Sequence, residues 1–372
     1  MNTSVQFDEG LVRRALDLAR QGIGLASPNP YVGAVLVDSN GTVVGEGVHT
    51  YAGIKHAEVL ALKQAGELAR GATLYINFEP CCHQGRTGPC ADALIKAGIK
   101  RVVACMMDPN PAVSGRGFHR LRDAGIEVSV GIFEAEARAL NEGFAKYIRT
   151  GEPLITLKSA MTLDGKIAPA EPGPYHITGD AARVHVQQLR HQSDAILAGI
   201  GTVLADDPLL TDRSGLSRRR PLLRVVLDSH LRLPLESRLL KTVANDVLIF
   251  YSLGNEQRAD MLHARGACLD KVPVAHGMLD IRAVMRKLSE LQITSLLVEG
   301  GSRVNTAFLS SGLVDKVFLY YAPKILGRGV PFVENDIQSQ FAEKLSSAKL
   351  HQFGEDFAIE GYVRDPYAVR SP

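Results

Sequence analysis

The sequence predicts an α/β protein with two domains, and three observations carry this prediction. The chain has 372 residues, more than a single hydrophobic core usually organises. Strand-like apolar runs alternate with helical segments in both halves, which is typical of an α/β layer. A polar break with glycine and proline, RTGEP at residues 149–153, separates the two alternations. We therefore expect one domain at residues 1–150 and a second at residues 151–372.

The first half opens with a helix and a hairpin. Residues 7–21 place apolar side chains on one helical face. Asn40-Gly41 supplies the positive φ angles of a tight turn between strands at 33–37 and 42–47. Further on, helices and strands alternate, which predicts a largely parallel sheet after the hairpin. The expected helices are 57–68, 91–97, 116–123 and 134–148, and the expected strands are 73–78, 101–106 and 126–130.

The second half shows the same alternation and two glycine signals. Gly199-Ile200-Gly201 follows a strand, but Leu204 stands where a dinucleotide fingerprint needs its third glycine. Gly300-Gly301 lies between a strand and a helix, where free amides can bind a phosphate; an ordinary tight turn is the alternative. The expected strands are 154–158, 194–198, 224–228, 247–251, 295–299 and 315–322, with helices at 180–190 and from 302 to about 309.

Composition limits the classes of function. A net charge of +2 without a long basic run argues against a dedicated nucleic-acid binder. Five cysteines in a long chain do not form a disulfide framework pattern. The N-terminus lacks the apolar core of a signal peptide, and no apolar run reaches membrane-spanning length. We expect a cytoplasmic homo-oligomer that binds neither nucleic acid nor membranes.

A metal motif lies between residues 56 and 90. His56 and Glu58 stand at the start of a predicted helix, and Cys81 and Cys90 follow a predicted strand. One imidazole and two thiolates hold zinc with a fourth position left for water, as in catalytic zinc sites. Glu58 is then the residue that shuttles protons for that water. A His-x-Glu and Pro-Cys combination of this kind is shared by zinc-dependent nucleobase deaminases.

The cysteine spacing departs from the commonest form of this motif. Eight residues separate Cys81 from Cys90, where two are usual. Cys82 directly follows Cys81, so the two side chains point in different directions. His83 as a fourth ligand would leave no position for water. We expect His56, Cys81 and Cys90 as ligands, with Cys82 and His83 as the open alternatives.

Short motifs extend through the first domain: Pro28-Asn29-Pro30, Val32-Gly33, Gly47-Val48-His49, His56-Ala57-Glu58, Glu79-Pro80-Cys81, Gly85-Arg86-Thr87, Asp108-Pro109-Asn110-Pro111 and Gly115-Arg116-Gly117. With the long cysteine spacing, they resemble the deaminase half of the bifunctional riboflavin-biosynthesis deaminase/reductases. Members usually have Thr-Pro-Pro-Cys before the last ligand, where this chain has Thr87-Gly88-Pro89-Cys90. The resemblance implies a cytidine-deaminase-like, three-layer first domain.

The resemblance also implies the first reaction. The substrate of that family is 2,5-diamino-6-(5-phosphoribosylamino)pyrimidin-4(3H)-one, whose 2-amino group leaves as ammonia. Asn29, His49, Arg86 and Asp108 are implied to contact it. Their chemistry suits the task, because an amide can pair with a pyrimidine edge and a guanidinium can hold a phosphate. Without the resemblance, Asn29 is a turn residue between prolines and Arg86 a solvated loop charge.

Motifs of the second half resemble the reductase half of the same family: residues 158–166, 177–179, 201–208, 298–301 and 322–327. The resemblance implies a dihydrofolate-reductase-like α/β fold that uses NADPH to reduce the ribosyl group to ribityl phosphate. The residues implied on the cofactor side are Ala160, His176, Thr202, Asp206, Ser229, Gly301, Ser302, Arg303, Val304, Asn305, Thr306 and Ala307. Those implied on the substrate side are Lys158, Pro174, Arg190, Leu210, Arg213 and Glu299.

One departure concerns the cofactor. Family members commonly have a Trp near Ile177, and this chain contains no Trp, so Tyr175 or His176 would have to supply any stacking. Lys158 is a candidate for polarising the sugar, or a structural lysine at a strand end. The zinc motif would also fit two other functions: a nucleoside or tRNA-base deaminase with an unrelated C-terminal domain, and a zinc-stabilised regulatory module. The intact Glu58 and the reductase-like motifs favour the two-step enzyme.

Overall fold

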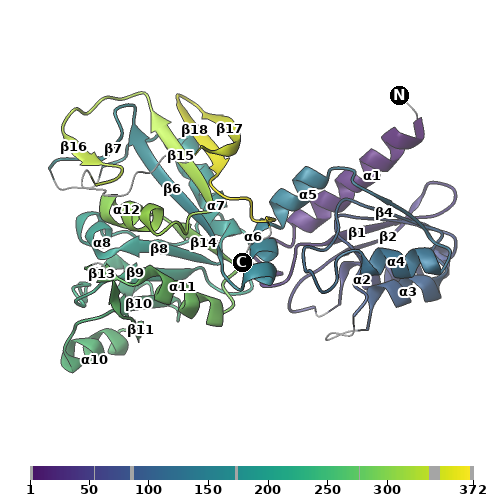
Figure 1. The fold of residues 1–372 in the computed structure, drawn as a ribbon, viewed down its shortest axis with the longest axis horizontal. Coiled ribbons are helices and arrows are strands. Elements are labelled where there is room, and N and C mark those ends of the chain that lie inside the picture. Colours follow the sequence, from purple (N-terminus) through teal and green to yellow (C-terminus); the bar gives the residue numbers. More distant parts are fainter. Residues whose placement is uncertain are drawn as a thin grey trace. The chain divides into compact units, whose positions relative to one another are not determined.

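The computed structural model describes residues 3–53, 55–83, 88–171, 175–275, 277–334 and 344–368. The chain divides into two compact units, residues 1–151 with 217–220, and residues 152–216 with 221–372 (Figure 1). Residues 217–220 fall within the second domain expected from the sequence, residues 151–372. They group with the first unit, where the Arg219 N–H donates to the Gly24 carbonyl at 2.8 Å and the guanidinium lies over the Tyr51 ring.

The first unit is built on a five-stranded sheet in the order β2-β1-β3-β4-β5. β1 is antiparallel to both β2 and β3, whereas β3, β4 and β5 are parallel. The strands are β1 (Gly33–Val37), β2 (Val43–Val48), β3 (Thr73–Ile76), β4 (Arg101–Ala104) and β5 (Glu127–Val130). The helices are α1 (Thr3–Arg20), α2 (Ala57–Ala65), the 3-10 helix η1 (Gly66–Ala69), α3 (Cys90–Ala97), α4 (Arg116–Asp123), α5 (Glu134–Leu140) and α6 (Glu142–Thr150).

Two strand glycines let helices lie directly on this sheet. A Cβ on Gly33 of β1 would come 2.2 Å from the Ala15 carbonyl oxygen of α1. A Cβ on Gly47 of β2 would come 2.1 Å from the Ala57 carbonyl oxygen of α2. Gly47 is paired with Ala34, the neighbour of Gly33, so the two glycines face opposite sides of the sheet. The unit therefore has three layers, and the start of α2 is held close to the strands.

The helix predicted at 134–148 is two helices, α5 and α6, separated at Asn141. Asn141 is buried and has a non-helical backbone, with φ −108° and ψ 18°. Its side chain accepts a hydrogen bond from the Tyr31 N–H at 2.8 Å and donates one to the Tyr31 carbonyl at 3.2 Å. This tertiary contact determines where the helix is interrupted. The hydrophobic periodicity of residues 134–148 gives no sign of the interruption.

The second unit is built on a nine-stranded sheet in the order β11-β10-β9-β8-β14-β6-β15-β18-β17. It is parallel from β11 to β15, and β18 and β17 extend it antiparallel. Its strands are β6 (Leu154–Thr162), β8 (Ala195–Gly199), β9 (Leu223–Leu227), β10 (Val247–Tyr251), β11 (Cys268–Lys271), β14 (Ser295–Val298), β15 (Lys316–Ala322), β17 (Ser346–Phe353) and β18 (Asp356–Tyr362).

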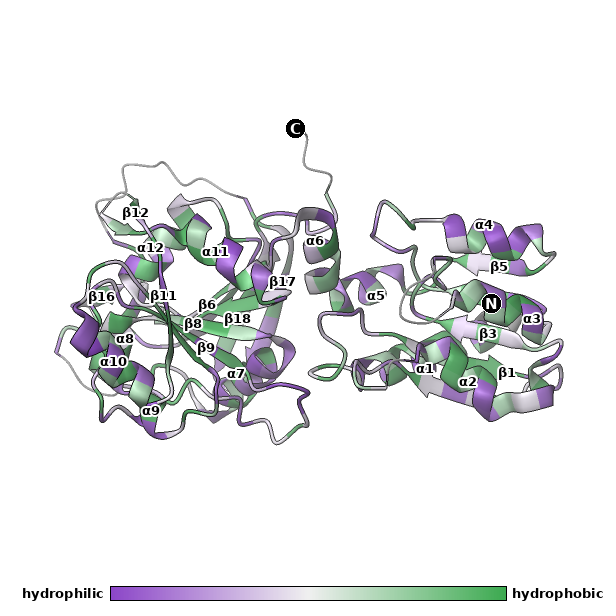
Figure 2. Cartoon of the chain, turned by 90° about the horizontal axis from the view of Figure 1, so that it is seen from below, coloured by the Kyte–Doolittle hydropathy of each residue, from purple (hydrophilic) through white to green (hydrophobic). Residues whose placement is uncertain are grey.

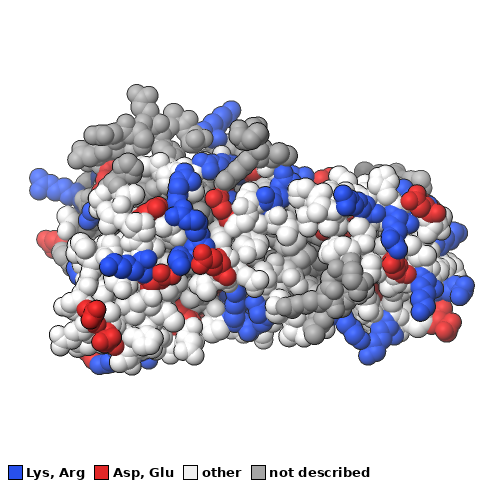
Figure 3. Space-filling view, turned by 60° about the horizontal axis from the view of Figure 1, so that its bottom comes forward, with Lys and Arg blue, Asp and Glu red and all other residues white. Residues whose placement is uncertain are grey.

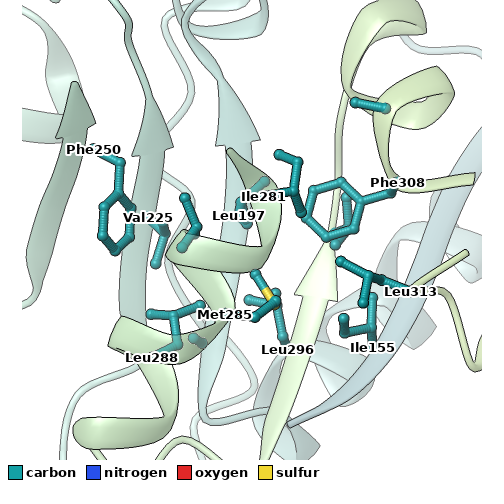
Figure 4. Packing of buried hydrophobic residues seen from close by; sticks show 14 of the residues in the cluster. Ile155, Leu197, Val225, Phe250, Ile281, Met285, Leu288, Leu296, Phe308 and Leu313 are labelled. Carbon is teal, nitrogen blue, oxygen red and sulfur yellow. The ribbon is translucent and has the colours of Figure 1, made fainter. Parts of the chain in front are cut away.

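Helices cover both faces of this sheet: α7 (Asp180–Gln192), α8 (Ile200–Asp206), α9 (Arg238–Lys241), α10 (Glu256–Ala264), α11 (Ile281–Glu290) and α12 (Ser302–Ser310). One core packs α11 and α12 on the strands through residues such as Leu197, Met285 and Phe308 (Figure 4). A second core, with Ile196 and Leu262, lies on the other face, because side chains alternate along β8. The strands β6, β8 and β9 are accordingly predominantly hydrophobic (Figure 2).

Two small ladders complete the second unit, β7 (Lys166–Pro169) with β16 (Gly329–Pro331), and β12 (Val274–Ala275) with β13 (Met278–Leu279). The predicted α/β class of both domains is confirmed. Across the part of the chain that the structure describes, no helix is both apolar and long enough for a membrane span. On the face seen in Figure 3, basic and acidic side chains are interspersed, in keeping with the small net charge.

Candidate functional sites

Three candidate metal ligands converge in the first unit. The donor atoms of His56, Cys81 and Cys90 all lie within 4.8 Å of one another. His56 Nδ1 is 3.1 Å from Cys90 Sγ and 3.5 Å from Cys81 Sγ. Tetrahedral zinc with ordinary Zn–N and Zn–S bonds separates such donors by about 3.6 Å. The three side chains therefore fit zinc in both chemistry and spacing.

The local structure explains this convergence. His56 is the residue that precedes α2, Cys90 is the first residue of α3, and Cys81 lies in the turn after β3. The Ala91 N–H donates to the Cys81 carbonyl at 3.1 Å, and the Cys90 N–H points at Cys81 Sγ at 3.3 Å. The partial positive charge of the two helix N-termini favours thiolate at this place. This group of three does not include Cys82 or His83, both of which the structure describes.

Protonation within the cluster is asymmetric. The hydrogen bond from Cys90 is the main reason that the pKa of the Cys81 thiol lies at about 4, well below its ordinary value. The same hydrogen bond, together with burial, raises the pKa of Cys90. Cys81 is thus a thiolate at neutral pH, and zinc binding has to displace the proton of Cys90.

Glu58 lies two residues after the ligand His56, in the first turn of α2. Its side chain is 3% exposed, and burial raises the pKa of its carboxyl group. A carboxyl group whose pKa is raised by burial holds a proton more readily than an exposed one. That is the property needed for moving protons at the metal site.

Asn29 and His49 form a hydrogen-bonded pair beside the cluster. The Asn29 Nδ2 group is 2.9 Å from His49 Nε2, and His49 Nδ1 is 3.0 Å from the Lys55 carbonyl oxygen. His49 therefore donates from Nδ1 and accepts at Nε2, which is the neutral form. Burial lowers the pKa of His49 and favours the same form. The ring of His49 meets that of His56 edge-on at 5.2 Å, so the pair borders the metal ligands.

Asp108 is the third predicted substrate contact that the structure describes. Its side chain is buried and accepts a hydrogen bond from the Asn110 N–H at 2.8 Å. Burial raises the pKa of Asp108 to about 6. Arg86, the predicted phosphate contact, lies outside the described residues.

Two buried polar residues near the metal ligands are not among the site residues expected from the sequence. Asn77 holds residues 31–33, because it accepts from the Gly33 N–H at 2.9 Å and donates to the Tyr31 carbonyl at 2.8 Å. Glu79 accepts hydrogen bonds from the backbone of the segment that carries Asp108. Asn77 directly follows β3 and Glu79 lies two residues further on, and these polar residues at the end of an apolar run were the available signal.

A second cluster of charges lies in the second unit, after β14. The Arg190 guanidinium on α7 donates to both carboxylate oxygens of Glu299, at 2.8 and 3.0 Å, and to the Thr211 carbonyl at 3.0 Å. Lys158 Nζ lies 3.4 Å from the same carboxylate. Burial by itself would raise the pKa of Glu299, but the charges of Arg190 and Lys158 outweigh it and hold that pKa at about 2.

These contacts bring together three of the predicted substrate residues. Lys158 lies in the middle of β6, which continues to Thr162, so the expectation of a strand-end lysine is wrong. Arg213 is exposed, whereas Leu210 is buried with a positive φ of 53°. Pro174 lies outside the described residues.

The predicted cofactor residues gather at the carboxyl ends of adjacent parallel strands. Thr202 and Asp206 lie on α8 after β8, Ser229 follows β9, and residues 301–307 open α12 after β14. Ala160 lies near the end of β6, and His176 is exposed. The carboxyl ends of parallel strands meet at one edge of a sheet, which is where α/β proteins bind nucleotides.

The start of α12 has the features of a phosphate cradle. A Cβ on Gly301 would stand 3.5 Å from Thr202 Oγ1, so the two helix starts face each other. Ser302 Oγ and Asn305 Oδ1 are buried and have no hydrogen-bond partner among the described residues. The Ser302 hydroxyl can donate a hydrogen bond to an anionic ligand at this helix N-terminus, whereas the Asn305 carbonyl oxygen can only accept one. This edge therefore fits the phosphates of a nucleotide cofactor.

Family models match both units. The model of the cytidine and deoxycytidylate deaminase zinc-binding region matches residues 5–106. The model of the RibD C-terminal domain matches residues 153–359. The alternative of a nucleoside or tRNA-base deaminase with an unrelated C-terminal domain is therefore wrong.

Curated relatives match almost the whole chain. The riboflavin biosynthesis protein RibD of Aquifex aeolicus is 44% identical over 95% of this chain and 98% of its own length. RibD of Escherichia coli is 45% identical over 86% of this chain and 89% of its own length.

Solved structures with similar folds are of the same kind of protein as these relatives. Form 1 of RibD from Acinetobacter baumannii has a TM-score of 0.82 and 39% identity, covering 96% of this chain and 99% of that one. A diaminohydroxyphosphoribosylaminopyrimidine deaminase/5-amino-6-(5-phosphoribosylamino)uracil reductase from Thermotoga maritima has a TM-score of 0.80 and 36% identity, covering 96% and 99%.

Proposed function

The chain belongs to the RibD family of bifunctional riboflavin-biosynthesis deaminase/reductases, and from this premise we propose how its own residues divide the two reactions. The enzyme hydrolytically deaminates 2,5-diamino-6-(5-phosphoribosylamino)pyrimidin-4(3H)-one and then reduces the ribosyl group of the product to ribityl phosphate. Its cofactors are zinc and NADPH. The first reaction belongs to the unit of residues 1–151 and 217–220, and the second to the unit of residues 152–216 and 221–372.

In the first unit, His56, Cys81 and Cys90 hold the zinc. Zinc so bound supplies an acidified water that is ready as hydroxide at neutral pH. Glu58 would carry the two protons of the water in turn. The first would go to the pyrimidine ring nitrogen as the water oxygen bonds to the carbon that bears the amino group, and the second would go to the amine as the C–N bond breaks and ammonia leaves. The burial of Glu58 supports this role, because a raised pKa lets one carboxyl group act as base and then as acid.

Asn29, His49 and Asp108 orient the pyrimidine in this proposal. The Asn29 amide N–H is engaged by His49, so the Asn29 carbonyl oxygen stays available as an acceptor for an amino group of the substrate. The buried Asp108 can bind a ring N–H or amino group. Arg86 would hold the phosphate of this substrate.

In the second unit, NADPH supplies hydride to the sugar, and the chain's residues bind and orient the reactants. Thr202, Ser302 and the amides of residues 301–303 hold cofactor phosphate; Ala160, His176, Asp206 and Ser229 border the same edge. Arg190 fixes Glu299, which in turn directs Lys158 toward the sugar oxygen. The exposed Arg213 is better suited than Arg190 to the substrate phosphate, because Glu299 and Thr211 already bind the Arg190 guanidinium.

The observation that carries this proposal is the convergence of one imidazole and two thiolates beside a buried Glu, in a chain that matches RibD proteins over nearly its whole length. The test is to incubate the zinc-loaded protein with the phosphorylated diaminopyrimidinone and follow ammonia and NADPH together. We expect equal amounts of ammonia formed and NADPH oxidised, with ammonia first. NADPH oxidation that precedes ammonia release would overturn the order of the two steps. The homo-oligomer, the cytoplasmic location and the absence of nucleic-acid and membrane partners stay predictions.

A further inference from the structure

The carboxylate of Glu79 accepts hydrogen bonds from four main-chain N–H groups. Its side chain is 3% exposed. Oε2 accepts from the N–H groups of Asp108 at 3.0 Å and Gly115 at 2.9 Å. Oε1 accepts from the N–H groups of Gly117 at 2.8 Å and Phe118 at 3.4 Å. Hydrogen bonds to an ionised carboxylate are stronger than neutral ones, so the four donors are held firmly.

These donors define one segment of the chain. Residues 105–118 connect β4 to the first turn of α4, and all four donors lie in this connection or at its end. The segment also packs directly on the turn that follows Glu79, because a Cβ on Gly117 would come 2.0 Å from the Pro80 carbonyl oxygen. The next residue along that turn is the zinc ligand Cys81.

Glu79 therefore joins two parts of the first site. On one side its backbone continues into Cys81, and on the other its carboxylate holds the Asp108 backbone. Asp108 has in addition its own side-chain bond to the Asn110 N–H, which orients the carboxyl group relative to the segment. Together with the packing of Gly117 on Pro80, this buried carboxylate thus holds Asp108 at a fixed place relative to the metal ligand.

We propose that Glu79 is a positioning residue for the deamination reaction, which sets the place of Asp108 relative to the zinc ligands. This proposal rests on the proposed deaminase function. Glu79 acts through Asp108 and neither touches the substrate nor binds the metal. Loss of the Glu79 carboxylate weakens binding of the pyrimidine, while the zinc ligands and Glu58 stay in place.

The test is Glu79→Gln in the full chain. Glutamine has the same shape but turns one acceptor oxygen into a donor, so two of the four backbone N–H groups lose their partner. We expect zinc content close to wild type, a lowered thermal midpoint of the first unit, unchanged reduction of pre-deaminated substrate, and a KM for deamination raised about tenfold with little change in kcat. Glu67→Gln, a substitution at an exposed position of the same unit, is the matched control and should change nothing.

Two further readouts separate positioning from a merely structural role. In the variant Glu79→Gln with Asp108→Asn, the KM should be no higher than in Asp108→Asn alone, because both changes remove the same contact. Hydrogen exchange of residues 107–118 should quicken in Glu79→Gln, and this measurement needs no activity. Three results would each overturn the proposal. They are a double variant whose KM is raised by the product of the two single effects, an unchanged KM in Glu79→Gln, and loss of zinc from Glu79→Gln.

A second variant guards against poor folding of Glu79→Gln. Gly117→Ala pushes the same segment away from Pro80 while Glu79 stays intact. Gly117→Ala should raise the KM for deamination and quicken the hydrogen exchange of residues 107–118. Exchange as slow as in wild type together with a normal KM would contradict the proposal. If the wild-type protein releases no ammonia, the deaminase function fails, whereas the exchange data still decide whether Glu79 holds the segment.

Discussion

Arg190 on α7 and Glu299 after β14 form a two-point ion pair, with N–O distances of 2.8 and 3.0 Å, in the interior of the second unit. From the sequence, both residues are expected to contact the substrate, each on its own. The contact instead shows that they depend on each other, since a buried charge needs a partner. Lys158 joins the pair at 3.4 Å, so one carboxylate balances two cations.

Glu299→Gln should destabilise the second unit. The substitution removes the carboxylate that Arg190 and Lys158 share, and breaking such a buried pair costs about 3 kcal/mol of unfolding free energy. Chemical denaturation of the full chain, with hydrogen exchange to assign the loss to the second unit, measures this. A stability equal to wild type would mean that water replaces the carboxylate without cost.

The difference in unfolding free energy between wild type and Glu299→Gln should depend on pH. The pKa of Glu299 is about 2 in the folded chain, against 4.5 for an ordinary glutamate. A carboxylate with a lowered pKa stabilises the fold fully above its unfolded pKa, and that contribution is lost as pH falls through the folded pKa. The gap between wild type and Glu299→Gln should therefore narrow between pH 4.5 and pH 2. A gap that stays constant over this interval would contradict the assigned pKa.

Gly47→Ala should damage the first site through the fold. The new Cβ would come 2.1 Å from the Ala57 carbonyl oxygen and push the start of α2, which carries His56 and Glu58, off the sheet. Overpacking of this kind costs about 2 kcal/mol. We expect weaker zinc binding and lower deaminase activity, with the reductase unchanged. Gly10→Ala on α1, where a Cβ meets no neighbour, is the control and should leave zinc binding as it is.

Gly301→Ala should weaken NADPH binding more than it weakens the fold. A Cβ there meets Thr202 Oγ1 at 3.5 Å, an ordinary contact, yet it occupies the space between two helix starts where phosphate is proposed to lie. The KM for NADPH should rise about tenfold, with thermal stability close to wild type. Steady-state kinetics on pre-deaminated substrate check this. An unchanged KM would place the phosphate elsewhere.

The alternation of strands and helices was predictable because it repeats locally in the sequence. The metal motif was predictable because its ligands stand next to helix starts and a turn, which local residue types announce. The break at Asn141 and the Glu79 contacts were not predictable in this way, since each depends on partners that are distant in the chain. β17 was missed because its residues are mostly polar and exposed at a sheet edge.

The Arg190–Glu299 pair shows the same limit. A buried charge can be recognised from neither residue alone, because its partner lies 109 positions away. Residues 217–220 are a further case, for their amide and ring contacts connect them with residues near the start of the chain. Sequence patterns identified which residues matter at each site, and tertiary contacts decide what each of them can do.

The most direct measurement is Glu58→Gln assayed on both substrates. Glutamine keeps the shape of the side chain but cannot carry the proton, so ammonia release should fall by ~10²–10⁴-fold. Zinc content should stay at the wild-type level, and NADPH oxidation on pre-deaminated substrate should be unchanged. Ammonia release at the wild-type rate would contradict the role of Glu58 and, with it, the assignment of the deaminase reaction to this site.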